Sequence, residues 1–240
     1  MYIYRYIIMP KLKLRNADRE LMILKNKEKG SWIESWDKPA RRSLGCFPHP
    51  FRIALLAPPN RGKTNVCKNL FLEHQKTKHK FKHLVVITAS KNSKEYDDLE
   101  PDSVLDTIPE LDVFDGKEKI CIIIDDYEFA KGDAEQLRRL TTLMRFISSH
   151  RNVSVFICYQ SFFNVPEIAR KCCNVFVLWK PNSNGELTTI ANRCGLDPSL
   201  MKQIFKQLCD DYYDSCTIDL TKGSPAKLRK NIYQPIDVEL

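Results

Sequence analysis

The sequence lacks a hydrophobic run long enough to cross a membrane. A spanning helix needs about 18 apolar residues in succession, and no stretch of this 240-residue chain approaches that length. Residues 1–10 contain Arg5 and end in Pro10, a composition that suits neither a spanning helix nor a signal peptide. We therefore expect a protein that is neither secreted nor inserted stably in a membrane.

Cysteine pairs with a metal-binding spacing are also missing. The chain has 9 cysteines, an odd number, and no two of them form the CxxC spacing that is typical of zinc sites. Without an export signal, disulfides are disfavoured. We expect reduced thiols that pack as small apolar side chains.

The charge is unevenly distributed along the chain. The 38 Lys and Arg exceed the 30 Asp and Glu by 8, and residues 1–50 alone contain 11 basic against 5 acidic residues. Residues 95–118 contain ten acidic residues and one lysine, whereas residues 74–83 and 222–230 form two further basic clusters. The excess of positive charge favours an anionic partner. Each basic cluster could equally be a solvated face or tail, and the acidic stretch is not expected to bind nucleic acid.

From residue 51 onward, apolar runs alternate with segments of helical periodicity. This alternation is typical of a parallel sheet covered by helices on both faces, so we expect one doubly wound α/β domain. The predicted strands are 51–56, 83–88, 119–124, 153–159, 175–179 and 217–220. The predicted helices are 63–75, 134–148 and a segment that begins at Pro198.

Cap residues and composition set the expected boundaries. Asp133 and Gln136 predict a capping box at the start of the second helix, and Asp197 followed by Pro198 predicts the start of the third. The helical period places Leu137, Leu140, Thr141, Met144 and Ile147 on one face. We expect a basic arm or small subdomain over 1–45, the α/β domain over 46–222 and a basic tail over 223–240.

The strongest motif is Ala-Pro-Pro-Asn-Arg-Gly-Lys-Thr at residues 57–64, between a predicted strand and a predicted helix. It matches the phosphate-binding pattern GxxxxGK[ST], with Ala57 in place of the first glycine. Such a loop cradles phosphates with backbone N–H groups, a lysine and a hydroxyl group that holds Mg²⁺. Proline has no N–H, so the amides from residue 60 to residue 64 must form the cradle. The expected nucleotide-binding residues are Pro59, Asn60, Arg61, Gly62, Lys63, Thr64 and Asn65.

A second motif supplies carboxylates. Residues 120–124 are apolar and are followed by Asp125 and Asp126, which is typical of a buried parallel strand whose acids emerge at the ligand-binding edge. We expect Asp125 and Thr64 to hold Mg²⁺ beside ATP. Asp126 is then placed to accept a proton from the attacking water or to orient it, with Glu128 as the competing candidate.

A third polar residue, Gln160, follows the apolar run 153–159. An amide at the end of a buried neighbouring strand can lie beside the γ-phosphate and sense whether it is present. With Lys63, these residues form the predicted catalytic set.

Taken in order, these motifs resemble the genome-packaging ATPases of large DNA viruses. The resemblance rests on the phosphate-binding loop, the strand that ends at Asp125, the Leu-Arg-Arg-Leu segment 137–140, residues 149–155 and Gln160-Ser161. It covers about residues 45–220. It is similar to the poxvirus-type enzymes, with relatives in virophages and Polinton-like elements, within the FtsK/HerA branch of P-loop NTPases.

The resemblance implies a RecA-like core (ASCE class) that assembles as a homo-oligomeric ring, a pentamer or hexamer. It further implies DNA-stimulated ATP hydrolysis that drives double-stranded DNA into a capsid, with capsid or portal-vertex proteins as partners, in the virion or the host cytoplasm. Relatives often have Arg-His-x-Asn before the sensor strand, but Ser149 stands in the first position here. Arg151 and Arg145 are the nearest candidates for an arginine finger, although each could instead be a helix-surface residue.

Three other functions stay open at this point. The same chemistry would serve a DNA translocase or helicase in replication or element mobility. A scaffold that does not hydrolyse ATP would follow if Ala57, Pro58 and Pro59 weaken the cradle. A small-molecule kinase is disfavoured, because no segment after residue 160 resembles an arginine-rich lid.

Overall fold

The computed structural model describes residues 11–14, 47–77, 80–89, 94–128, 133–221, 224 and 226–239, with 11–14 and 239 described by their backbone alone. Most of the expected arm 1–45 and its basic residues thus lie outside the described residues. The strands are β1 (Lys11–Leu14), β2 (Arg52–Leu56), β3 (His83–Thr88), β4 (Ser103–Leu105), β5 (Ile120–Asp125), β6 (Val153–Tyr159), β7 (Val175–Trp179), β8 (Ser215–Asp219), β9 (Leu228–Lys230) and β10 (Gln234–Glu239). The helices are α2 (Lys63–Gln75), α3 (Ala134–Thr142), α4 (Ser148–His150), α5 (Glu167–Cys172), α6 (Asn184–Arg193) and α7 (Pro198–Gln207), with shorter helical segments η1 (Asp97–Leu99), η2 (Leu111–Val113) and η3 (Leu143–Ile147).

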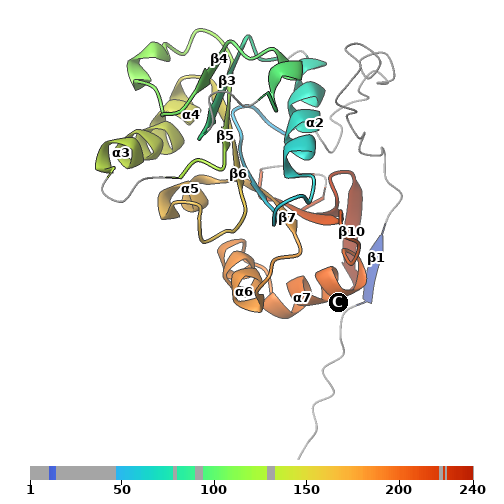
Figure 1. The fold of residues 1–240 in the computed structure, drawn as a ribbon. Helices are drawn as coiled ribbons and strands as arrows, with labels where there is room; N and C mark the ends of the chain where they lie inside the picture. The colour runs from blue at the N-terminus through green and yellow to red at the C-terminus, as the bar shows by residue number, and fades with distance from the viewer. Residues whose placement is uncertain are drawn as a thin grey trace, which may run out of the picture.

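The strands form one sheet in the order β1-β10-β9-β8-β7-β2-β6-β5-β3-β4. The six strands from β7 to β4 run parallel, and the strands from β8 to β1 add an antiparallel half (Figure 1). Strand β2 lies between β6 and β7, and β5 lies on the other side of β6. The ends of β2, β6 and β5 therefore meet at one edge of the sheet.

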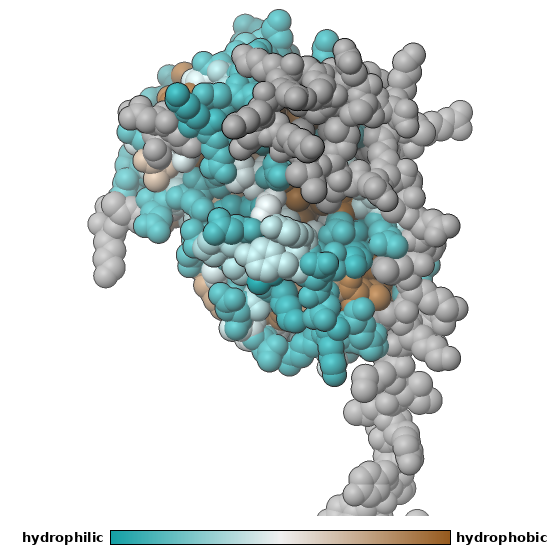
Figure 2. All heavy atoms as spheres, turned by 45° about the vertical axis from the view of Figure 1, so that its right-hand side comes forward, coloured by the Kyte–Doolittle hydropathy of each residue, from teal (hydrophilic) through white to brown (hydrophobic). Residues whose placement is uncertain are grey.

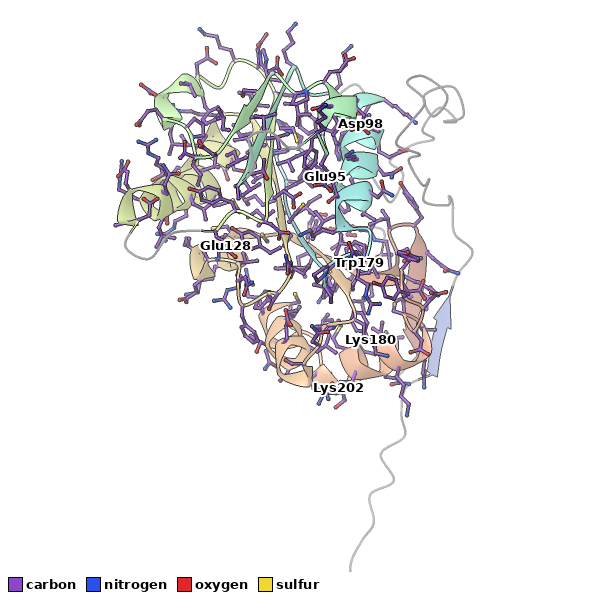
Figure 3. The ribbon with its side chains drawn as sticks, viewed as in Figure 1. Glu95, Asp98, Glu128, Trp179, Lys180 and Lys202 are labelled. Carbon is purple, nitrogen blue, oxygen red and sulfur yellow. The ribbon has the colours of Figure 1, made fainter. Side chains whose placement is uncertain are left out.

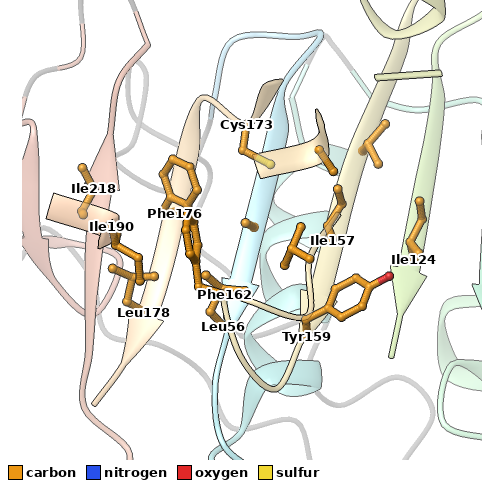
Figure 4. Packing of buried hydrophobic residues seen from close by; sticks show 14 of the residues in the cluster. Leu56, Ile124, Ile157, Tyr159, Phe162, Cys173, Phe176, Leu178, Ile190 and Ile218 are labelled. Atoms are coloured by element: carbon orange, nitrogen blue, oxygen red, sulfur yellow. The ribbon is translucent and has the colours of Figure 1, made fainter. Parts of the chain in front are cut away.

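Successive residues of β2 point to opposite faces, and each face has its own core. Ile53 and Leu55 pack with Val66 and Leu70 of α2. On the other face, Leu56 belongs to a core that also contains residues of α3, η3, α5, α6 and α7 (Figure 4). Helices thus cover both faces, and the expected doubly wound α/β fold is confirmed.

The second predicted helix is longer and less regular than its apolar period indicated. It continues as α3, η3 and α4, and η3 has π-helical hydrogen bonding, so the turn is wider there and the face shifts. Leu143 is fully buried in place of Leu137, which is exposed. Asp133 caps Gln136 N–H at 3.1 Å, but the Gln136 side chain accepts from Ile108 N–H instead of completing the capping box.

The C-terminal segment is part of the sheet. Strands β9 and β10 lie within the region expected to be a tail, and β9 pairs with β8. Arg229, assigned from sequence to a basic cluster, is fully buried and forms an ion pair with buried Asp219. The tail assignment is therefore wrong for residues 228–239: these strands are short and mixed in polarity, and the acid that pairs with Arg229 is ten positions away.

The described cysteines are free thiols, and all but Cys172 are buried. Burial raises the pKa of Cys173 to about 12 and of Cys194 to about 11, and it raises those of Cys121 and Cys158 well above the ordinary value. These thiols therefore stay neutral at physiological pH and pack as apolar groups, as expected.

The face in Figure 2 is mostly hydrophilic where the chain is described, with small apolar areas. Among the helices of the described residues, none combines the length and apolar character that a bilayer crossing requires. The exposed large apolar side chains of the described residues include Leu137, Phe146 and Phe163.

His83 is the basis of a pH-dependence prediction. Its ring bonds to Glu118 at 2.6 Å and to Asp102 at 3.2 Å, and these bonds, Glu118 first, raise the pKa of His83. We expect an NMR titration midpoint above the ordinary value of about 6.5. Because the folded-state pKa is raised, the stabilisation is complete below the unfolded-state pKa and is lost as pH rises through the folded-state pKa.

The matching stability measurement compares wild type with His83→Gln across pH. The stability difference should be largest in acid and should shrink toward alkaline pH. Glu118→Gln should lower the His83 midpoint while keeping the ring in place. A wild-type midpoint at or below 6.5 would contradict the prediction.

Candidate functional site

A pocket of about 450 Å³ lies at the sheet edge where β2, β5 and β6 end. Most of the residues predicted from the motifs line it. The lining residues are Pro58, Pro59, Asn60, Arg61, Gly62, Lys63, Thr64, Asn65, Lys68, Glu95, Asp125, Asp126, Gln160 and Tyr213. Segments as far apart in sequence as residues 58 and 213 thus meet in one place.

The loop from β2 into α2 has the backbone that a phosphate cradle requires. Asn60 and Gly62 have positive φ angles of 63° and 84°, so the left-handed positions of the turn fall on an asparagine and a glycine, which tolerate them best. Ala57, in place of the expected glycine, instead donates its N–H to Tyr159 O at 3.1 Å and continues the β2–β6 pairing. Helix α2 starts at Lys63, so its first N–H groups face the pocket edge.

Lys63 lies between the two aspartates that follow the apolar strand. Its ammonium is 2.9 Å from Asp126 Oδ1 and 3.6 Å from Asp125 Oδ1. Burial alone lowers the pKa of Lys63, but the negative groups around it, the two aspartates among them, outweigh burial and raise its pKa. Lys63 is therefore a fixed positive charge inside the pocket.

Asp125 is nearly buried and has one unsatisfied oxygen. Oδ2 accepts from the Tyr96 hydroxyl at 2.7 Å, whereas within the described part of the chain Oδ1 is buried and has no hydrogen-bond partner. Burial raises the pKa of Asp125, and Lys63 and Tyr96 oppose this rise. A carboxylate oxygen without a hydrogen-bond donor, in a pocket that Thr64 also lines, fits the oxygen ligands that Mg²⁺ prefers.

Asp126 is the more accessible of the two acids. Its backbone has a φ of 43°, and its N–H donates to Cys158 O at 2.9 Å, which ties the turn after β5 to β6. The carboxylate is 44% exposed and also accepts a hydrogen bond from the Gln160 amide at 3.4 Å. The turn thus joins Lys63, Asp126 and Gln160 through one carboxylate.

Two glutamates, Glu128 and Glu95, differ in whether they line the pocket. Glu128, the competing candidate from sequence, is exposed and does not belong to the lining among the described residues. Glu95 does line the pocket, and its negative charge acts on Asp125. In the view of Figure 3, Glu95 lies beside α2 and Glu128 lies apart from it, toward α5.

The two arginines proposed as fingers lie away from the pocket of their own chain. Arg151 donates to the carbonyl groups of Leu111 and Phe114 at 3.1 and 2.7 Å, so it anchors the segment before β5. Arg145 is exposed on η3 beside the exposed Phe146. Both precede the start of β6, and neither belongs to the lining of the pocket.

Sequence reasoning did not identify Lys68, Glu95 or Tyr213 as site residues. Lys68 bonds to Asp98 at 2.8 Å. Glu95 could have been suspected, because it follows a predicted strand whose end lies at the same edge. Tyr213 lines the same pocket as a loop that is far from it in the sequence, and no local pattern indicates that approach.

Several residues of the two basic clusters are buried or paired within the fold. In the cluster at 74–83, His74 is buried and accepts a hydrogen bond from Phe47 N–H at 3.1 Å. Lys78 and His79 lie outside the described residues. In the cluster at 222–230, Lys230 pairs with Asp214 at 2.8 Å and Arg229 is buried, so neither cluster is a free phosphate-binding surface as a whole.

No protein-family model matches this chain, and neither does any curated protein sequence. Solved structures do match it. The genome-packaging NTPase B204 of Sulfolobus turreted icosahedral virus 2, in complex with ATP-γ-S, superposes with a TM-score of 0.56 at 14% identity, covering 79% of this chain and 99% of that one. B204 of Sulfolobus turreted icosahedral virus, described as a DNA-packaging ATPase, gives 0.55 at 11% identity, covering 80% and 100%.

A third match is the cytoplasmic domain of the type VII secretion ATPase EccC from Thermomonospora curvata. Its TM-score is 0.51 at 10% identity, and it covers 78% of this chain but 25% of EccC. At such identities the matches establish the fold. This chain has the α/β fold of P-loop NTPases, and the resemblance to viral genome-packaging ATPases expected from the motifs is confirmed at that level.

Proposed function

We propose that this chain is an ATP-driven motor that packages double-stranded viral DNA into capsids. One observation carries the proposal: Asp125, Asp126 and Gln160, at the ends of two neighbouring parallel strands, share one pocket with Lys63 and the phosphate-binding loop that follows a third strand. The match to the full length of B204 supports the packaging role.

The phosphates of ATP would bind to the backbone N–H groups of residues 60–64 and to Lys63. A helix N-terminus and an ammonium both favour negative charge there. Since the Lys63 ammonium lies 2.9 Å from Asp126 in the structure, it would turn from the aspartate to the phosphates. That movement would free the Asp126 carboxylate, so nucleotide binding would itself prepare the proton acceptor.

Asp125 and Thr64 would hold Mg²⁺, which supplies charge neutralisation to the β- and γ-phosphates when bound. Asp126 would accept the proton of the attacking water, and Gln160, already within reach of Asp126, would orient that water. Asp125 is poorly suited to accept the proton, because its carboxylate is 8% exposed and one oxygen is bonded to Tyr96.

The motor would act as a homo-oligomeric ring, a pentamer or hexamer, in which one subunit supplies an arginine to its neighbour's site. Arg145 suits that role better than Arg151, because Arg145 is exposed whereas Arg151 is bonded to two carbonyl groups. Capsid or portal-vertex proteins would be its partners, in the virion or the host cytoplasm.

The test is ATP turnover of the full chain with no DNA, with duplex DNA and with single-stranded DNA, each with Mg²⁺ and with excess EDTA. We expect Mg²⁺-dependent hydrolysis that duplex DNA stimulates several-fold. Turnover that is the same with and without DNA would exclude a DNA motor. No turnover under any condition would instead indicate a scaffold that does not hydrolyse ATP.

A DNA translocase outside packaging is the second candidate. The structural similarity to EccC, a type VII secretion ATPase, supports this candidate, because it shows the same fold in an ATPase that does not package genomes. Both candidates predict DNA-stimulated turnover. Protection of added DNA from nuclease by capsids of the same virus, dependent on this protein and ATP, would distinguish packaging from other translocation.

A further inference from the structure

Residues 210–214, the segment between α7 and β8, lie against the phosphate-binding loop. Tyr213 lines the same pocket as Lys63 and Asp125. A Cβ atom on Gly62 would lie 4.0 Å from Tyr213 Cδ1. The ring is therefore close to the start of α2, on the solvent side of the cradle.

The backbone of this segment is held from several sides. The Trp179 indole donates to Tyr213 O at 3.1 Å, and Arg61 of the phosphate-binding loop donates to Tyr212 O at 2.7 Å. Ion pairs hold both ends, Lys180 with Asp210 at 3.1 Å and Lys230 with Asp214 at 2.8 Å. Figure 3 labels Trp179, the last residue of β7, and Lys180, which follows it in the chain.

On this fixed backbone Tyr213 is 68% exposed. Tyr212 packs edge-on against it, with ring centroids 4.9 Å apart, and Tyr212 in turn lies under the Arg61 guanidinium at 3.8 Å. Tyr213 thus has support on one side while much of the ring faces solvent. An aromatic ring held out of the core beside a phosphate cradle suggests a flat apolar ligand group.

We propose that Tyr213 is the stacking platform for the nucleobase of the bound nucleoside triphosphate. The inference deepens the proposed function and rests on it. The cradle and Lys63 recognise phosphates, which leaves the base to find an apolar surface. Tyr213 is the exposed aromatic residue that lines the pocket, and because its backbone is already held, little conformational entropy is lost when a base covers it.

Stacking makes a specific prediction about ligands. Every base has a π face, so a stacking platform accepts all nucleotides, purines more tightly than pyrimidines because they cover more ring. It contributes nothing to a ligand that has phosphates but no base. Inorganic tripolyphosphate is therefore the control ligand.

The experiment measures dissociation constants of the full chain for a non-hydrolysable ATP analogue and for tripolyphosphate, both with Mg²⁺. Tyr213→Ala should weaken the analogue roughly tenfold and leave tripolyphosphate unchanged. Tyr213→Phe, which keeps the ring, should bind as wild type does, and Tyr213→Leu, which keeps apolar bulk without the ring, should resemble Tyr213→Ala. Unchanged melting temperatures would show that the variants are folded.

Two results would overturn the inference alone: unchanged analogue binding in Tyr213→Ala, or equal weakening of both ligands. In each, the wild type still binds and hydrolyses ATP. If wild type binds neither ligand and Lys63→Ala changes nothing, the proposed function fails together with the inference.

Discussion

Replacing Lys63 with alanine should reduce ATP turnover by roughly 10²–10³-fold, the loss expected when one preorganised positive group is removed from a developing charge. The ammonium is nearly buried, and its neighbours raise its pKa, so it stays charged throughout the physiological range. The measurement is steady-state ATP hydrolysis with duplex DNA present, together with binding of a non-hydrolysable analogue, which should weaken as well.

Folding must be separated from chemistry in this variant. Lys63 is the cation beside the nearly buried Asp125, and removing one partner of a buried pair destabilises a protein strongly. Melting temperatures should therefore be compared among Lys63→Ala, Lys63→Arg and wild type. Lys63→Arg keeps the charge but not the length and shape of lysine, so it should fold and still hydrolyse ATP slowly.

Lys202→Ala is the matched lysine control. Lys202 is exposed on α7 and does not line the pocket, and in Figure 3 it lies apart from Glu95, which does line it. Its removal should leave turnover within about twofold of wild type, the range of neutral surface changes. If Lys63→Ala retains turnover comparable to that of Lys202→Ala, the loop does not bind the reacting phosphates.

The parts of this site that could be predicted are those with a local signal. A buried parallel strand is a continuous apolar run, so the positions of Asp125 and Gln160 at strand ends followed from composition alone. Helix α2 was predicted with the bounds that the structure has, because the Gly-Lys-Thr turn and the apolar period both mark it. Residues 59–65 could then be predicted as nucleotide-binding residues, because they are next to this turn in the sequence.

The rest depends on contacts between distant segments. Arg229 stands in a short run with Lys227 and Lys230, and such a basic run favours a solvated tail until Asp219 is known to lie beside Arg229. Similarly, Tyr213 is one of two adjacent tyrosines in a polar loop. Only the contact of that loop with Arg61 shows that Tyr213 lies at the pocket. The π-helical turns of η3 changed the buried face of the second helix for the same reason: tertiary packing outweighed the local period.

The second large effect concerns the proton acceptor. Asp126→Asn should lower kcat by about 10²–10⁴-fold, as expected for loss of a general base. Asparagine keeps the shape and can still accept from Lys63 and Gln160, whose bonds to Asp126 are 2.9 and 3.4 Å. Analogue binding should therefore change little, and the loss should fall on kcat.

Two amide variants complete the comparison and decide between the carboxylates. Glu128→Gln should stay within about twofold of wild type, because Glu128 is exposed and outside the lining of the pocket among the described residues. Glu95→Gln removes a carboxylate from the same pocket as Asp126, so it controls for the general effect of charge there and should cost less than Asp126→Asn. If Glu95→Gln or Glu128→Gln gives the larger loss of kcat, that glutamate is the proton acceptor, and the release of Asp126 by Lys63 is not a step in catalysis. The full ranking, with Asp126 first, would identify the proton acceptor as the carboxylate that Lys63 holds at 2.9 Å.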